Sequence, residues 1–135
     1  MKALKPKPTE IFIQLATMAD QSEGYLKIKN NDSFMPLSVE RLYDVQFGPH
    51  KGIVYSFAHY GTQNGDLMAD PEMTFIYIPE LKKVFPSSYT NHYAGAYLET
   101  IYQEDEKWMI NKSNQAEQAI FADVWMVNIK EQQEL

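Results

Sequence analysis

The sequence contains no cysteine and a single arginine, Arg41, among its 135 residues. The lack of cysteine excludes a disulfide framework, a Cys-ligated zinc site, an iron–sulfur cluster and a thiol nucleophile. Arginine is the usual bidentate partner of guanine and phosphate, so one arginine argues against sequence-specific reading of duplex DNA. The formal net charge of −6 argues the same way, because an acidic surface repels phosphate.

Long apolar runs are also lacking. The lysines near the N-terminus are not followed by the apolar stretch that a signal peptide needs. The longest apolar stretch, residues 119–129, is interrupted by Asp123 and Asn128 and is too short to span a bilayer. We therefore expect a cytoplasmic protein with no membrane contact and no cofactor. The length is that of one domain, residues 1–135, with residues 1–8 as a mobile lead-in.

Two helices are expected, one near each end of the sequence. The first covers residues 8–21 and shows apolar side chains at helical spacing. The last covers residues 114–130, where Ile120, Val124 and Val127 form a stripe on a wide apolar face. Such a face either packs within the domain or is buried partly in a homodimer, and the sequence leaves both alternatives open.

Between these helices lie five or six segments with strand patterns. The clearest are residues 26–28, 39–47, 53–60, 73–78 and 96–102, with a short further pairing at 107–110. Pro86 limits residues 84–89 to an edge strand, because proline cannot donate a ladder hydrogen bond. Short connections between successive strands favour an antiparallel β-meander. The sequence therefore predicts an α+β fold with both helices packed on one face of the sheet.

Residues 59–75, HYGTQNGDLMADPEMTF, form a polar segment between two apolar strands. We expect a loop that is longer than a tight hairpin needs, with a turn at Asn64–Gly65. Loops held on rigid strands carry function more often than cores do, so this loop is the candidate binding site. Its candidate binding residues are His59, Tyr60, Gln63, Asn64, Asp66, Met68, Asp70 and Glu72.

A second interpretation makes the same segment a metal or acid–base site. One nitrogen and three carboxylates suit a hard cation such as Mg²⁺ or Ca²⁺. They are supplied by His59, Asp66, Asp70 and Glu72. The spacing matches neither an EF-hand nor another metal motif. Asp66 and Asp70 are equally suited to pin a loop by bonding its backbone amides.

The segment also resembles a family of small bacterial proteins of unassigned activity that are carried on conjugative elements and phages. The residues that carry the resemblance are His59-Tyr60, Gln63 to Met68 and Asp70 to Phe75, and Tyr93 to Tyr102 is more loosely similar to the closing segment of the family. The resemblance implies a host context and no chemistry, so no catalytic residue follows from it.

Two hypotheses about function result. The first is an accessory protein of a mobile element or phage that binds another protein through residues 59–75 and the neighbouring aromatic side chains. The alternative is a small metal-dependent hydrolase or nuclease that uses His59, Asp66, Asp70 and Glu72.

Overall fold

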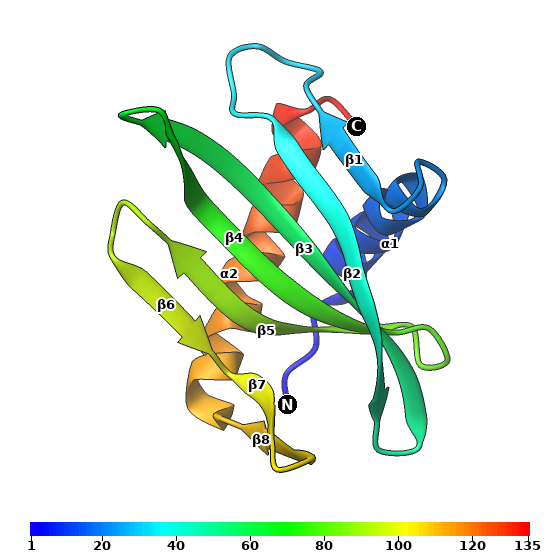
Figure 1. Ribbon diagram of the computed structural model, residues 1–135. Helices are drawn as coiled ribbons and strands as arrows, with labels where there is room; N and C mark the ends of the chain where they lie inside the picture. Colours follow the sequence, from blue (N-terminus) through cyan, green and yellow to red (C-terminus); the bar gives the residue numbers. More distant parts are fainter.

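The computed structural model describes residues 1–135 and contains two helices and eight strands (Figure 1). In chain order they are α1 (Pro6–Asp20), β1 (Tyr25–Ile28), β2 (Leu37–Phe47), β3 (His50–Gln63), β4 (Asp66–Ile78), β5 (Lys83–Asn91), β6 (Ala96–Glu99), β7 (Ile101–Glu104), β8 (Lys107–Ile110) and α2 (Lys112–Gln132). Strands β1 to β6 form one antiparallel sheet in sequence order, and β7 pairs with β8. The expected α+β meander is confirmed.

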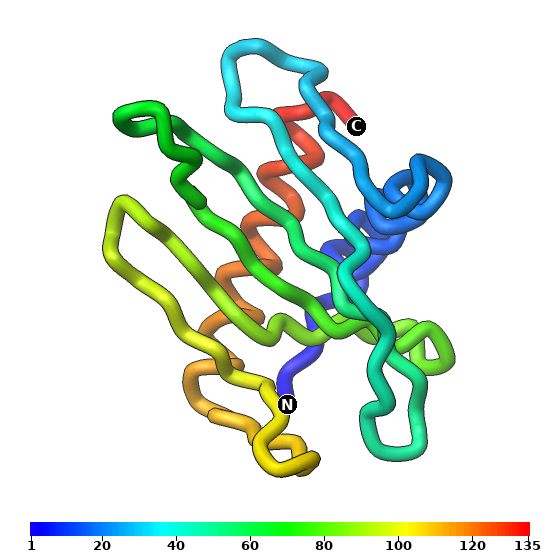
Figure 2. The backbone as a smooth tube through the Cα atoms, in the orientation of Figure 1, coloured from blue at the N-terminus to red at the C-terminus, as the bar shows by residue number.

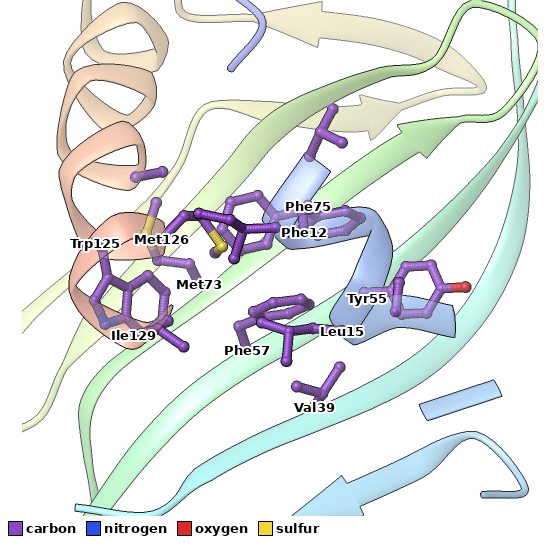
Figure 3. Close-up of a cluster of buried hydrophobic side chains, with 14 of the residues drawn as sticks. Phe12, Leu15, Val39, Tyr55, Phe57, Met73, Phe75, Trp125, Met126 and Ile129 are labelled. Atoms are coloured by element: carbon purple, nitrogen blue, oxygen red, sulfur yellow. The ribbon is translucent and has the colours of Figure 1, made fainter. Parts of the chain in front are cut away.

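Both helices pack on the same face of the sheet, as Figure 1 shows. The core lies between the layers, where aromatic side chains from β3 and β4 meet Phe12 of α1 (Figure 3). The rings of Phe12 and Phe57 stack with centroids 4.8 Å apart, and Phe75 meets Phe12 edge-on at 5.3 Å. Each fully buried ring contributes about 1.5–3 kcal/mol to folding. Neither helix has the length and the apolar composition that a bilayer-spanning helix needs.

Helix α1 starts at Pro6, where the missing N–H costs no intrahelical bond. The residues before it, expected to be a mobile lead-in, make defined contacts. The N–H of Leu4 donates to the carbonyl of Val84 at 2.9 Å, and Leu4 is buried. The backbone N–H and carbonyl of Lys2 both bond to the side-chain amide of Gln115, at 2.7 and 2.8 Å. The N-terminal segment is thus attached to both β5 and α2.

Helix α2 packs through a different face from the one that apolar periodicity indicates. Ile120 and Val124, at the centre of the expected stripe, are 54% and 59% exposed. The buried face includes Ala119, Ala122, Met126 and Ile129 together with the polar Gln115 and Gln118. Gln118 is accommodated there because its amide accepts from the Thr100 hydroxyl at 2.7 Å and donates to the Leu98 carbonyl at 3.1 Å. Self-association through residues 114–130 stays a prediction.

The later strands differ from the expectation in two places. Strand β5 lies between β4 and β6, but it pairs with β6 only over Ser88–Asn91. Residues 84–86 pair with β4 alone, so the expected edge character holds around Pro86, which cannot donate a ladder hydrogen bond, and it fails for residues 88–89. The expected strand 96–102 is interrupted at Thr100, which separates β6 from β7.

The hairpin of β7 and β8 folds onto the other face of the sheet, at one end only (Figure 1). A second, smaller core forms there from Val54, Ile76, Ile78, Phe85 and Ile101. Trp108 fixes the hairpin, because its indole N–H donates to the carbonyl of Gln46 at 3.0 Å and its ring packs on Phe47. The remainder of this second face is not covered by any helix.

Candidate functional site

The segment 59–75 forms a β-hairpin, so the expectation of a long loop was wrong. Strand β3 continues to Gln63 and β4 begins at Asp66, which leaves only Asn64 and Gly65 in the turn. Both turn residues have positive φ, 53° and 85°, as in the two-residue hairpins that favour Asn-Gly. The two-residue turn fixes the register in which Gly61, Thr62 and Gln63 pair with Met68, Leu67 and Asp66. The strands therefore continue to the turn although these residues are mostly polar.

The hairpin separates the candidate metal ligands. His59 points toward the helices and is only 5% exposed. Its Nδ1 lies 3.0 Å from the carbonyl oxygen of Pro36, and its ring meets the ring of Trp125 edge-on. Burial lowers the pKa of His59. Asp66 lies at the exposed hairpin tip, and no group of three or more His, Cys, Asp or Glu side chains assembles anywhere in the chain. The four residues of the metal interpretation do not converge.

Gln63, Asn64 and Asp66 are exposed at the turn, and Met68 is half-buried beside them. Asp66 makes no side-chain hydrogen bond, and the turn is held by the pairing of Gln63 with Asp66 in the ladder. Asp70 does act as a pin, since its Oδ1 accepts from the side-chain amide of Asn91 at 3.1 Å.

The β3–β4 hairpin is fastened to the turn between β5 and β6, and the two tips lie side by side in Figure 2. The N–H of Ala69 donates to Nδ1 of His92, and the N–H of His92 donates to the carbonyl of Ala69, both at 2.9 Å. Tyr93 packs over Gly61. We call this contact the hairpin joint, comprising Gly61, Ala69, Asp70, Asn91, His92 and Tyr93. It gives a structural role to the part of the chain that carries the family resemblance.

Tyr60 and Glu72 lie on the second face of the sheet. Oε2 of Glu72 accepts from the hydroxyls of Ser56 at 2.8 Å and Tyr60 at 3.4 Å. Burial, followed by the charge of Glu72, raises the pKa of Tyr60 to about 12. These two candidates therefore belong to one hydrogen-bonded group that crosses strands β3 and β4.

This group is part of a larger polar surface on the side of the sheet that faces away from the helices. Alternate residues of β1 to β6 point there, because successive side chains of a strand lie on opposite faces. We call it the open face and define it by Tyr25, Lys27, Ser38, Glu40, Tyr43, Ser56, Tyr60, Glu72, Thr74, Ser88, Thr90, Tyr97 and Glu99. The surface combines hydroxyl groups with three carboxylates and one lysine at the edge strand.

None of the three carboxylates on the open face is ion-paired. The salt bridges of the protein join Arg41 to Asp20 and Asp44, and His50 to Glu80. Glu40, Glu72 and Glu99 take part in none of them, although Lys27 on the edge strand β1 shares their face. The open face is thus a negatively charged surface with phenol and hydroxyl donors around it.

A cleft of about 810 Å³ lies elsewhere, between the β2–β3 hairpin and the turn that follows β4. Arg41, Asp44, Lys51 and Glu80 are among its lining residues. Arg41 is already held by two carboxylates, and the hydrogen bond to Asp44 raises its pKa. The cleft therefore contains no free guanidinium.

Sequence reasoning found Tyr60 and Glu72 but missed the other members of the open face. A sequence pattern that indicates this face was present, because hydroxyl and acidic residues occupy every second position in several strands. Ser38 and Glu40 show it in β2, as do Thr74 after Glu72 in β4 and Thr90 after Ser88 in β5. It was overlooked because each pair is short and the apolar residues between them define the strand.

The fold and this surface together define a small α+β protein with a helix-covered meander and one hydroxyl-rich, acidic sheet face. The chain belongs to the family described as a domain of unknown function, DUF6908, whose model matches residues 9–135. No curated protein and no solved structure matches the chain.

Proposed function

We propose that this protein is an accessory binding module, of the kind carried by mobile elements and phages, that docks a basic segment of another protein on its open face. The observation that carries the proposal is the set of three carboxylates without cationic partners, Glu40, Glu72 and Glu99. A partner segment rich in Lys or Arg supplies the missing charges, and charge complementarity steers such an encounter.

The composition of the face supports binding of a protein. Tyrosine is enriched at interfaces because its ring gives contact area and its hydroxyl gives a hydrogen bond. Tyr25, Tyr43 and Tyr97 are 50%, 59% and 67% exposed and stand around the carboxylates. Residues 59–75 contribute through Tyr60 and Glu72, whereas the buried side chain of His59 is not part of the docking surface.

Site-specific photo-crosslinking in the native host cells tests the proposal. A benzoylphenylalanine at position 25 places the photoreactive group on the open face, and the same residue at position 124 is the matched control on the exposed side of α2. Both positions are at least half exposed, so the substitution is tolerated by the fold. We expect a discrete adduct with another protein from position 25, and from position 124 no adduct other than one with a second copy of this chain.

Charge and salt provide the second arm of this experiment. The double variant Glu40→Gln and Glu72→Gln should reduce the yield of the adduct. Irradiation of a cell lysate in 1 M salt, where the Debye length falls to about 3 Å, should reduce it as well. An adduct with another protein that forms equally from position 124, or that is unaffected by the double variant, contradicts docking on the open face. The absence of any adduct from position 25 contradicts it as well.

A further inference from the structure

One end of the open face is hollowed into a pocket of about 210 Å³ beneath the β7–β8 hairpin. Its lining residues come from β2 to β8 and include Tyr43, Val54, Thr74, Glu99, Tyr102 and Trp108. We call it the Glu99 pocket. Strands lie 4.7–4.9 Å apart, so about 19 Å would separate β2 from β6 in a flat sheet. Tyr43 and Glu99 line the same small pocket only because the sheet curls toward its open face.

The pocket has an apolar floor and aromatic walls. Val54 and Ile76 of the smaller core lie at its base, and Tyr43, Tyr102 and Trp108 stand around it. The Trp108 ring is held in place by its hydrogen bond to the Gln46 carbonyl, at 3.0 Å. Aromatic faces attract cations within about 6 Å of the ring centroid, and a fixed ring loses no freedom when it does so.

Glu99 is the single charged residue among those that line the pocket. Glu99 forms no salt bridge. Burial, followed by the negative charge of Glu99, raises the pKa of the neighbouring Tyr97. A carboxylate beside aromatic rings favours a ligand that is apolar along its length and positively charged at its end. The long stems of Lys and Arg side chains fit this description.

The size of the pocket limits the ligand to a single side chain. Sites for complete small molecules have volumes of roughly 300–1,000 Å³, and the Glu99 pocket is smaller. It is also continuous with the open face, since Glu99 and Thr74 belong to both. A segment lying on the open face can therefore insert one side chain here without leaving the sheet.

We infer that the Glu99 pocket is the specificity site of the docking surface and takes the cationic side chain of one Lys or Arg residue of the bound protein segment. Cation–π contact with Tyr43, Tyr102 and Trp108 and ion pairing with Glu99 distinguish this side chain from an apolar one. The inference rests on the proposed function and adds the residue type that the partner must present.

The test is an NMR titration of the ¹⁵N-labelled full-length protein with three capped tripeptides, Gly-Lys-Gly, Gly-Arg-Gly and Gly-norleucine-Gly. The norleucine peptide keeps the apolar stem and lacks the charge. We expect saturable shifts of the Trp108 indole N–H and of the Glu99 amide with the Lys or the Arg peptide, and at least threefold weaker binding of the norleucine peptide. Comparing the Lys and Arg peptides identifies the preferred cation.

Glu99→Gln should weaken binding of the basic peptide about three- to fivefold, as removal of a partly exposed ion pair does. Glu106→Gln in the turn between β7 and β8 removes the same charge outside the pocket and should leave the affinity unchanged. Equal binding of the norleucine peptide, or equal loss in both variants, overturns the inference. Chemical-shift changes confined to Tyr60 and Glu72 also overturn the inference about the Glu99 pocket, but they are compatible with docking on the open face. Failure of the crosslinking experiment, in contrast, contradicts docking on the open face.

Discussion

Tyr93 lies over Gly61 so closely that a Cβ on Gly61 would overlap the phenol oxygen. The contact joins β3 to the turn between β5 and β6, two segments with no direct ladder pairing. Glycine at this position therefore allows the Tyr93 ring to lie against β3, and a side chain here would displace that ring.

Gly61→Ala should lower stability by about 1 kcal/mol, because the added methyl group displaces the Tyr93 ring. The same substitution in a Tyr93→Ala background should be neutral or slightly stabilising, since alanine restricts the unfolded chain more than glycine does. Urea unfolding of the four proteins in this cycle measures the coupling. Equal effects of Gly61→Ala in both backgrounds would show that the contact does not contribute.

The hairpin turn should depend on Gly65 and hardly at all on Asp66. Gly65 has φ of 85°, and alanine there costs about 1–2 kcal/mol because its Cβ approaches the following carbonyl. Asp66 is exposed and forms no side-chain hydrogen bond, so Asp66→Ala should change the free energy of unfolding by less than about 0.5 kcal/mol. Thermal melts of the two variants compare them directly. A larger loss of stability in Asp66→Ala would show that the Asp66 carboxylate does stabilise the turn.

His59 should make the protein less stable in mild acid. Burial lowers its pKa in the folded state, so it stays neutral there while the unfolded chain takes up a proton near pH 6.5. The unfolded state then binds more protons, and the free energy of unfolding falls as the pH decreases from about 6.5 toward the folded-state pKa. Urea unfolding from pH 7.5 to 5 measures this slope.

The control for the acid effect is His59→Gln, which keeps a polar side chain and removes the titration. Its stability should vary less over this pH range than that of the parent protein. An unchanged slope in His59→Gln would assign the effect to other groups.

The open face should hold the Tyr60 phenol in its neutral form well above the usual tyrosine range. Burial and the Glu72 charge raise its pKa to about 12, so any stability linked to this hydroxyl is complete below pH 10 and is lost between pH 10 and 12. Glu72→Gln should lower the pKa of Tyr60 but keep it above 10, because the contribution of burial remains. NMR titration of the ¹³Cζ resonance of Tyr60 measures it.

Glu40→Gln is the matched comparison for this measurement. Its charge also raises the Tyr60 pKa, but less than that of Glu72, so the decrease should be smaller. A larger effect from Glu40 would mean that the phenol of Tyr60 points toward β2 and away from the neighbouring strand β4.

The sheet could be predicted from sequence where apolar residues alternate, and the prediction failed where polar residues are fixed by partners distant in the chain. Residues 26–28 show the alternation and lie within β1 as expected. Residues 61–63 belong to β3 without any such pattern, because their pairing follows from the Asn64–Gly65 turn. The buried face of α2 was missed because Gln115 and Gln118 lie on it, and their backbone partners cannot be found by helical periodicity.

The candidate site shows the same limit. Tyr60 and Glu72 were identified within a polar segment, but their grouping with Glu40 and Glu99 depends on strand order and register. Neither is visible in the spacing of the residues along the chain. The placement of His59 on the opposite face agrees with the alternation within β3, which puts it on the same side as Tyr55 and Phe57.

The glutamines of the last helix and its C-cap determine when the fold can be completed. Gln115 holds the backbone of Lys2, and Gln133 accepts from the N–H of Asn30 and donates to the carbonyl of Met35. These partners precede every strand from β3 onward, and α2 is synthesised after all of them. The part of the sheet that α2 covers therefore stays open until α2 has been made, and its apolar side chains are exposed to association with other chains until then.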